Sequence, residues 1–258
     1  MTLKRVDEQY RGLTYTWGRL DHPEETPFQV APGVWWLRFT MPGPLNHINL
    51  WLLEDGDGWT IVDTCLNLET AKAQWESLFD GFMGGKPVKR VICTHMHPDH
   101  IGLAGWLCER FACDLYMTQA EFLTGSLIMG YTGEQAPPAA ISFYHRAGFS
   151  AGQLDHYRDR FGGFGQFTTP LPHNYQRLTD RQTLAIGGRY WQIVVGEGHS
   201  PEHACLYCPA LQLVIAGDQI LPRITPNVSV LPTQPDGNPW EAWLASSTRL
   251  LGMLPEDL

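Results

Sequence analysis

The feature that most constrains this chain is a short apolar run, residues 88–93, that ends abruptly in a cluster of histidines and a carboxylate. The run is rich in β-branched residues and is closely followed by Pro98, a pattern that predicts a buried β-strand leading into a loop. The loop carries the following side chains in quick succession: His95, His97, Asp99 and His100. We therefore expect these groups together at the end of one strand.

The spacing within this cluster predicts two metal-binding points rather than one. Side chains alternate along an extended chain, so His95 and His97 face the same way, and Pro98 favours the extended conformation at His97. Pro98 also suits the first turn of a helix, which would direct Asp99 and His100 towards a second, nearby point. Imidazole with carboxylate is a ligand set that zinc and similar first-row ions take. The alternative interpretation is a solvated polar loop without a metal.

The cluster resembles the His-x-His-x-Asp-His motif of the metallo-β-lactamase fold superfamily. That resemblance implies an aspartate at the end of an earlier strand, a downstream histidine after glycine, and an aspartate at the end of a later strand. The sequence supplies them as Asp63, His199 and Asp218. The resemblance extends from about residue 33 to the C-terminus, and it implies an α/β fold, a four-layer αββα sandwich, in a single domain over residues 1–258.

The resemblance also implies a set of ligands and a cofactor. The first site would use His95, His97 and His199, and the second would use Asp99, His100 and a later histidine, with Asp218 bridging the two. The cofactor would be one or two Zn²⁺ ions, with iron or manganese as alternatives. The last histidine of the sequence is His203, which relatives use to support the loop. We therefore expect either a chain that is truncated before the seventh ligand or a second metal that is weak or absent.

Hydrolysis by a metal-bound hydroxide is the chemistry that the resemblance implies, because metal ions lower the pKa of bound water and polarise the attacked oxygen. Asp99 and Asp63 are the predicted catalytic carboxylates; Asp63 would accept a hydrogen bond from a ligating imidazole or a loop amide. An aspartate at position 218 and a histidine directly after Asp99 resemble the glyoxalase II, lactonase and thioesterase branches. We expect hydrolysis of a thioester or ester, with a lactone as the alternative. Phosphodiester cleavage, β-lactam hydrolysis and a non-catalytic metal-binding scaffold are less favoured.

Composition narrows the class of partner. A chain of 258 residues with 43% hydrophobic residues is long enough for one large core. Its formal charge of −9 disfavours nucleic acid, and no apolar stretch approaches the roughly 18 residues of a membrane span. We expect a cytoplasmic protein with a small-molecule substrate, no nucleic-acid or membrane partner, and free cysteines. Cys205 and Cys208 form either a packed pair on opposite faces of a strand or a redox or zinc pair; packing is favoured.

Periodicity predicts the remaining elements of the chain. Residues 1–32 form a predicted N-terminal arm and residues 118–175 a helical, aromatic-rich insertion. Strands are predicted at 33–40, 48–53, 59–63, 88–93 and 114–117, with hairpins at 180–195 and 204–217. Helices are predicted at 68–82, 101–111 and 238–254, and within the insertion at 121–129, 139–147 and 152–161. The aromatic residues of the insertion form either its own small core or a cover over the substrate.

Three further residues are candidates for substrate binding. His47 ends a loop that lies beside the metal site in relatives, so it either lines the pocket or caps a strand. Tyr144 belongs to the aromatic insertion. Arg223, five residues after Asp218, either pairs with an acidic substrate group or is an ordinary surface arginine.

Overall fold

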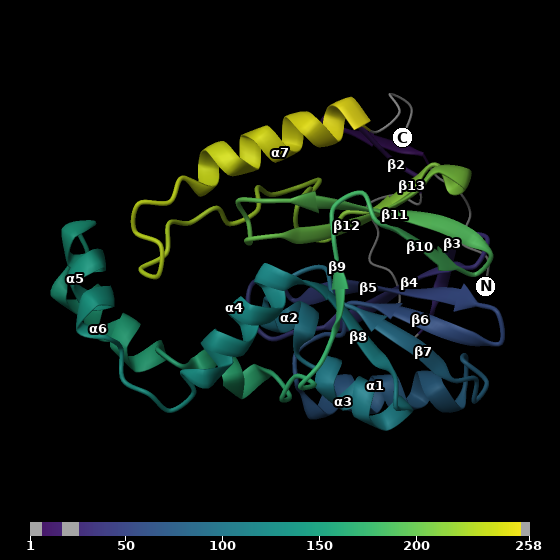
Figure 1. The fold of residues 1–258 in the computed structure, drawn as a ribbon, viewed down its shortest axis with the longest axis horizontal. Coiled ribbons are helices and arrows are strands. Elements are labelled where there is room, and N and C mark those ends of the chain that lie inside the picture. Colours follow the sequence, from purple (N-terminus) through teal and green to yellow (C-terminus); the bar gives the residue numbers. More distant parts are fainter. Residues whose placement is uncertain (1–6, 17–25, 254–258) are drawn as a thin grey trace.

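Two β-sheets packed face to face form the centre of the molecule, and helices cover both outer surfaces (Figure 1). The computed structural model describes residues 7–16 and 26–253. One sheet has seven strands in the order β3-β4-β5-β6-β7-β8-β9, and the other has four in the order β10-β11-β12-β13. A two-stranded ribbon, β1 (Glu8–Tyr10) with β2 (Leu13–Tyr15), stands apart from both.

The seven-stranded sheet begins as an antiparallel meander and ends parallel. Its antiparallel strands are β3 (Phe28–Ala31), β4 (Val34–Thr40), β5 (His47–Asp55) and β6 (Gly58–Val62). The parallel strands β7 (Val88–Ile92), β8 (Asp114–Thr118) and β9 (Gln176–Leu178) follow. The predicted meander over residues 33–63 is confirmed.

The predicted N-terminal arm contains short strands where the structure describes it. Residues 28–31 form β3, which pairs with β4 at the edge of the large sheet. Phe28 is buried there and meets the Trp36 ring edge-on, with ring centroids 6.4 Å apart. A four-residue strand is too short to show a period, which is why the pattern was not visible in the sequence. Residues 1–6 and 17–25 of the arm lie outside the described residues.

The four-stranded sheet is antiparallel throughout. Its strands are β10 (Thr183–Ile186), β11 (Arg189–Gly196), β12 (His203–Cys208) and β13 (Leu213–Ile215). Gly187 and Gly188 make the turn between β10 and β11, with φ values of 59° and 74°, a region that glycine adopts without steric cost. The short 3₁₀ helix η2 (Pro209–Leu211) lies between β12 and β13. Both predicted hairpins are confirmed.

The helices follow the predicted pattern with one division. They are α1 (Glu69–Asp80), α2 (Pro98–Ile101), α3 (Ala104–Phe111), α4 (Gln119–Gly130), α5 (Pro138–Arg146), α6 (Ala151–Arg160) and α7 (Pro239–Met253), together with the 3₁₀ helix η1 (Gly163–Phe167). The segment predicted as one helix over 101–111 divides into the end of α2 and all of α3. A Cβ on Gly102, at the division, would lie 2.5 Å from two backbone carbonyl oxygens.

Three apolar interfaces separate four layers, which confirms the αββα sandwich. The first joins α1 and α3 to the large sheet through residues such as Trp75, Phe79 and Leu107. The second joins the two sheets through Leu53, Ile92, Trp191 and Ile193. The third joins the small sheet to α7 through Val194, Cys205 and Leu250.

The two cysteines of β12 settle the packing question raised by the sequence. Cys205 belongs to the interface with α7, whereas Cys208 belongs to the interface between the sheets. All six cysteines are free. Cys205 and Cys208 therefore face opposite ways and pack, as predicted.

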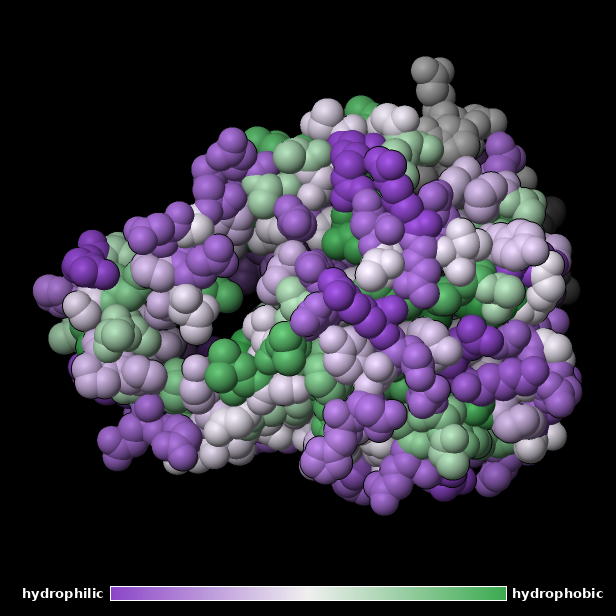
Figure 2. All heavy atoms as spheres, in the orientation of Figure 1, coloured by the Kyte–Doolittle hydropathy of each residue, from purple (hydrophilic) through white to green (hydrophobic). Residues whose placement is uncertain are grey.

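Helices α4, α5 and α6 with η1 fill the chain between β8 and β9, and α5 and α6 project from the body (Figure 1). Aromatic rings pack on one another within this projection: the Tyr144 ring lies 4.8 Å from that of Phe149 and 4.6 Å from that of Tyr157. The same residues line a cavity of about 720 Å³. Figure 2 shows a hollow between the projection and the body, with apolar side chains at its edge over α4. In the described part of the chain, no helix combines the length and apolarity that crossing a membrane requires.

Candidate metal centre

The site forms where strands of both sheets end. Asp63 directly follows β6, and residues 94–97 follow β7, its parallel neighbour. Since parallel strands end at the same edge, these two segments meet. From the small sheet, His199 follows β11 and Asp218 follows β13. The groups predicted from scattered parts of the sequence therefore meet at one edge between the sheets.

Three imidazoles converge in a first group: His95, His97 and His199. His95 Nε2 lies 2.8 Å from His97 Nδ1 and 3.1 Å from His199 Nε2. His199 Nδ1 lies 2.9 Å from the Asn227 carbonyl oxygen; because that oxygen accepts only, Nδ1 donates and Nε2 presents a lone pair to the group. Burial lowers the pKa of all three rings, that of His97 to about 3. Neutral imidazole is the form that binds metal.

A second group shares His95 and adds His100 and Asp218, whose ligand atoms lie within 4.8 Å of one another. His100 Nε2 lies 3.5 Å from Asp218 Oδ1, while His199 Nε2 lies 3.5 Å from Asp218 Oδ2. One carboxylate therefore faces both groups, which is the arrangement expected of a bridging ligand. Asp99 Oδ2 lies 3.7 Å from His100 Nε2. No later histidine joins this group among the described residues.

The side chains of the second group shift one another's pKa values towards the charged forms of Asp218 and His100. Burial raises the pKa of Asp218, but the neighbouring His100 and His199 lower it well below its usual range. Burial also raises the pKa of Asp99. For His100 burial lowers the pKa, yet the carboxylates of Asp63, Asp99 and Asp218 together raise it well above its ordinary value. Three carboxylates around one imidazole are negative charge that a cation would balance.

Asp63 holds the second group in place through a buried hydrogen-bond network. Its Oδ1 accepts the Thr94 backbone N–H at 2.8 Å, and its Oδ2 accepts the Thr94 hydroxyl at 2.9 Å and His100 Nδ1 at 2.8 Å. The hydrogen bonds expected of Asp63, from an imidazole and a loop amide, are both present. Because Nδ1 donates to Asp63, Nε2 carries the lone pair whenever the His100 ring is neutral, the form that binds metal.

The unpartnered state of His100 Nε2 tests whether a metal fits here. This nitrogen is buried and makes no hydrogen bond, although buried polar atoms are almost always paired. It points towards carboxylate oxygens that accept hydrogen bonds when ionised and donate none. A divalent cation between these acceptors satisfies all of them, so the donor set fits one.

His203 supports the loop that carries Asp218, as predicted. Its Nε2 accepts the backbone N–H of Asp218 at 3.0 Å, and burial lowers its pKa to about 3, which keeps the ring neutral and able to accept. Gly217 has a φ of 50°, and a Cβ there would lie 2.6 Å from the His203 ring. Glycine at 217 therefore lets the Asp218 loop lie against His203.

The three predicted substrate-binding residues have the following neighbours. His47, the first residue of β5, has Nδ1 2.9 Å from an Arg38 guanidinium nitrogen and contacts the Asn46 side-chain oxygen. The Arg223 guanidinium lies 5.6 Å from the Tyr15 ring centroid, and Tyr144 lies in the projecting cavity. Their roles in substrate binding stay predictions.

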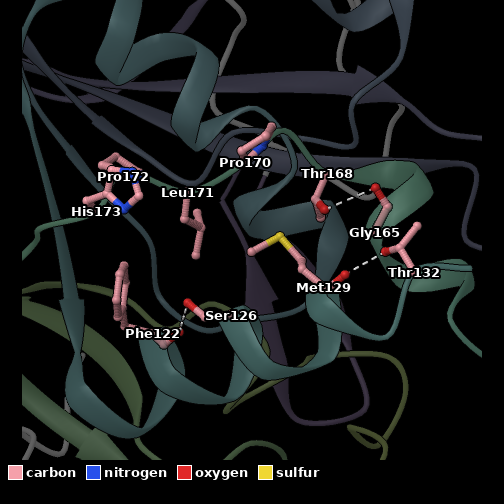
Figure 3. A pocket seen from close by; sticks show the side chains of 10 residues that line it. All are labelled: Phe122, Ser126, Met129, Thr132, Gly165, Thr168, Pro170, Leu171, Pro172 and His173. Carbon is pink, nitrogen blue, oxygen red and sulfur yellow. Dashed lines mark hydrogen bonds between the residues drawn. The ribbon is translucent and has the colours of Figure 1, made fainter. Parts of the chain in front are cut away.

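A second, smaller cavity of the insertion is also lined by residues outside the histidine groups. It has a volume of about 520 Å³ and runs between α4 and the segment that returns towards β9 (Figure 3). Phe122, Ser126 and Met129 of α4 face Leu171 and His173 across it. None of the grouped ligands lines this cavity.

Glu121, in the first turn of α4, is a site residue that sequence reasoning missed. Its side chain is fully buried and its oxygens accept the backbone N–H groups of Met96 and Glu202. Burial raises the pKa of Glu121 to about 7, although Ser200 and the two amides favour the charged form. The available signal was a single charged residue in the otherwise uncharged helix 119–130.

Comparison with known proteins agrees with this geometry. The family model described as the Metallo-beta-lactamase superfamily matches residues 43–258. This chain belongs to that superfamily. It is similar to the crystal structure of a beta-lactamase domain protein from Burkholderia ambifaria, with 39% identity, a TM-score of 0.82, and coverage of 94% of this chain and 72% of that one.

The curated relatives of this chain are more distant from it in sequence. A probable metallo-hydrolase, YybB, of Bacillus subtilis (strain 168) is 26% identical over 191 residues, which are 74% of this chain and 70% of the relative. A linear primary-alkylsulfatase of Pseudomonas sp. (strain ATCC 19151) is 24% identical over 210 residues, 77% of this chain but only 38% of that protein. These likenesses support a metal-dependent hydrolase in general and leave the substrate open.

Proposed function

We propose that this protein hydrolyses an ester or thioester of a small molecule with the help of zinc bound by the two groups of ligands. The observation that carries the proposal is the position of Asp218, whose two oxygens face His100 of one group and His199 of the other at 3.5 Å. When bound, divalent ions at such a site lower the pKa of a coordinated water and polarise the attacked oxygen.

The residues of the chain orient and hold protons around that site. His95, His97 and His199 present neutral nitrogens, and Asp63 fixes the orientation of His100 through Nδ1. We assign proton exchange to Asp99 Oδ2, because the Asp99 side chain is 22% exposed and so reaches both the cluster and solvent. No serine or cysteine nucleophile is required.

The apolar surface of α4, which begins beside the cluster, favours a substrate with an apolar acyl group. Glu121 ties the first turn of α4 to the loop between His95 and His97, so α4 begins next to the site. Further along the helix, Leu123 and Leu127 are 54% and 51% exposed on one face, four residues apart. Apolar side chains over α4 lie at the edge of the hollow in Figure 2, and the exposed leucines of this helix suit a hydrocarbon chain better than a polyanion.

Alternatives differ in the bond that is cleaved. A lactone places the same ester group in a ring. The alkylsulfatase relative makes a sulfate ester of a linear alcohol a further candidate, favoured by the apolar face of α4. A phosphodiester of nucleic acid is disfavoured by the formal charge of −9.

The test has two parts, metal content and a substrate panel. Protein purified without chelator and supplied with zinc should hold the metal, and His97→Ala should hold less, whereas His173→Ala, which removes an exposed histidine outside the groups, should hold as much as the wild type. The panel contains acyl thioesters, aryl esters, lactones, alkyl sulfates, β-lactams and phosphodiesters. We expect turnover of thioesters or esters that is lost in Asp99→Ala. Protein that takes up no transition metal contradicts the proposal, and turnover confined to phosphodiesters contradicts its substrate class.

A further inference from the structure

The buried carboxylate of Glu121 joins two loops that are far apart in the sequence. Oε2 accepts the Met96 N–H at 2.9 Å, and Oε1 accepts the Glu202 N–H at 2.7 Å. Met96 stands between the ligands His95 and His97, and Glu202 stands three residues after His199. Each oxygen therefore holds one ligand-bearing loop.

The first group of imidazoles draws its members from these same two loops. His95 and His97 come from the loop after β7, and His199 comes from the loop after β11. Within the group, His95 Nε2 approaches His199 Nε2 to 3.1 Å, and the ring centroids of His97 and His199 lie 4.7 Å apart. The separation of the loops consequently sets whether three nitrogens reach one ion.

Further hydrogen bonds fix the start of α4 to the His199 loop. The Glu202 carboxylate accepts the Ala120 N–H at 2.9 Å, and the Thr118 hydroxyl donates to the Glu202 carbonyl oxygen at 2.7 Å. Residues 118 and 120 flank the start of the helix, so Glu121 projects from a fixed backbone. The first turn of α4 thus acts as a rigid connection between the loops.

A carboxylate suits this position better than an amide does. Each of the two loops presents a backbone N–H group to Glu121; such groups only donate, and a carboxylate offers them two accepting oxygens. A glutamine offers one oxygen, and its NH₂ group would face the second backbone N–H. That donor would lose its partner inside the protein, where leaving it unpaired is unfavourable.

We propose that Glu121 is a positioning residue that sets the metal affinity of the group formed by His95, His97 and His199 by holding their two loops at the ligating distance. This inference rests on the proposed metal function. Glu121 touches neither an ion nor the substrate, because its side chain is fully buried behind Met96 and Glu202. Its effect reaches the site through the backbone of the loops.

The experiment compares Glu121→Gln with a matched control, Asp55→Asn. Asp55 is also a buried carboxylate that accepts several hydrogen bonds, from the Thr60 hydroxyl, the Arg90 guanidinium and the Gly187 N–H, but it lies at the opposite end of β6 from Asp63. Both variants lose acceptor capacity, and only one of them touches the ligand loops. Urea unfolding of the metal-free proteins measures the structural effect, and zinc competition with a chelator measures the affinity.

We expect Glu121→Gln to weaken zinc binding by about tenfold or more, in the range found when outer partners of metal ligands are removed. Asp55→Asn should bind zinc as the wild type does, even where the two variants lose similar stability. Cobalt supplies a spectroscopic readout: the visible bands of the Co²⁺-loaded protein should change in Glu121→Gln and not in Asp55→Asn. If Glu121→Gln does not fold, Glu121→Asp replaces it, since the shorter carboxylate keeps its charge but reaches only one loop.

Two failures are distinguishable. Wild-type protein that binds neither zinc nor cobalt contradicts the proposed function itself. Wild-type protein that binds zinc, together with a Glu121 variant whose zinc affinity and cobalt spectrum are unchanged, overturns the positioning role and leaves the metal site standing.

Discussion

Replacing Asp63 with asparagine should weaken the second metal position by changing which nitrogen of His100 carries the proton. Asp63 accepts from two sides at once: the Thr94 backbone N–H at Oδ1 and His100 Nδ1 at Oδ2. An asparagine has only one oxygen for these two places. The Thr94 N–H is a donor in every state, so the oxygen stays with it and the NH₂ group turns towards His100.

The consequence for His100 follows from this reorientation. Facing a donor, Nδ1 must accept, and the proton of the neutral ring then moves to Nε2, the nitrogen directed at Asp99 and Asp218. A protonated Nε2 does not bind metal. Loss of an orienting partner of a metal-ligating histidine typically lowers metal affinity by about 10–100-fold, which corresponds to roughly 1.4–2.7 kcal/mol.

Isothermal titration of metal-free Asp63→Asn with zinc measures this effect directly. We expect binding to the group of His95, His97 and His199 to change little, and binding that depends on His100 to weaken by the stated factor. Asp55→Asn serves as the control for general destabilisation, because Asp55 is also a buried carboxylate but lies at the other end of β6. An Asp63→Asn protein with the zinc stoichiometry and affinities of the wild type would refute the tautomer argument.

Two further changes have outcomes that follow from the structure. Gly217→Ala should lower the free energy of unfolding by about 2–5 kcal/mol, because the alanine would have a left-handed backbone and a Cβ 2.6 Å from the His203 ring. The control Gly188→Ala, whose Cβ would have nothing within 4 Å, should lower it by only about 1–2 kcal/mol, the cost of the left-handed backbone. Urea denaturation measures both values. The pKa of Glu121 is about 7 in the folded chain against an ordinary 4.5, so between these pH values the folded state binds more protons than the unfolded one. Its stabilising contribution is therefore complete below about pH 4.5 and is lost, by roughly 3 kcal/mol, as the pH rises to 7. Urea unfolding of the metal-free wild type and of Glu121→Gln across this range should show the slope in the difference between their free energies of unfolding, because the buried histidines contribute equally to both proteins.

Much of the fold is predictable because local patterns agree with the tertiary structure. Residues 88–92 are apolar and β-branched, and the strand there is buried in the large sheet, so period and environment give the same answer. Gly187 and Gly188 mark their turn through conformations that glycine readily adopts. The edge strand β3 and the division between α2 and α3 were not predictable. Both depend on backbone contacts with distant segments, such as the approach of the Cys65 carbonyl to Gly102.

Some residues of the site could likewise be predicted from the sequence, and others could not. The ligands from the loop after β7 could be predicted because their spacing and residue types are local. His199 and Asp218 required the family resemblance, since nothing in their own surroundings brings them to that loop. The role of Glu121 could not be predicted from the sequence, because its two partners lie 25 and 81 residues away and only the folded chain brings them together. Its single local signal, a lone charge in an uncharged helix, is equally typical of an exposed glutamate.

Assembly of the site depends on packing between the sheets. His95 and His97 follow a strand of the large sheet, and His199 and Asp218 follow strands of the small one. The ligands therefore meet only when the two sheets have packed together through the apolar interface of Leu53, Ile92, Trp191 and Ile193. The Ala204 N–H donates to the Thr94 carbonyl oxygen at 2.7 Å and connects β12 to the ligand loop directly. The apolar interface supplies most of the free energy that joins the sheets, because hydrophobic burial scales with area while each hydrogen bond adds only about 1 kcal/mol net. The polar contacts of Glu121, Asp63 and His203 then fix the positions of the ligand-bearing loops relative to one another. Substitutions in the apolar interface should consequently affect stability first, and substitutions in the polar contacts should affect metal affinity first.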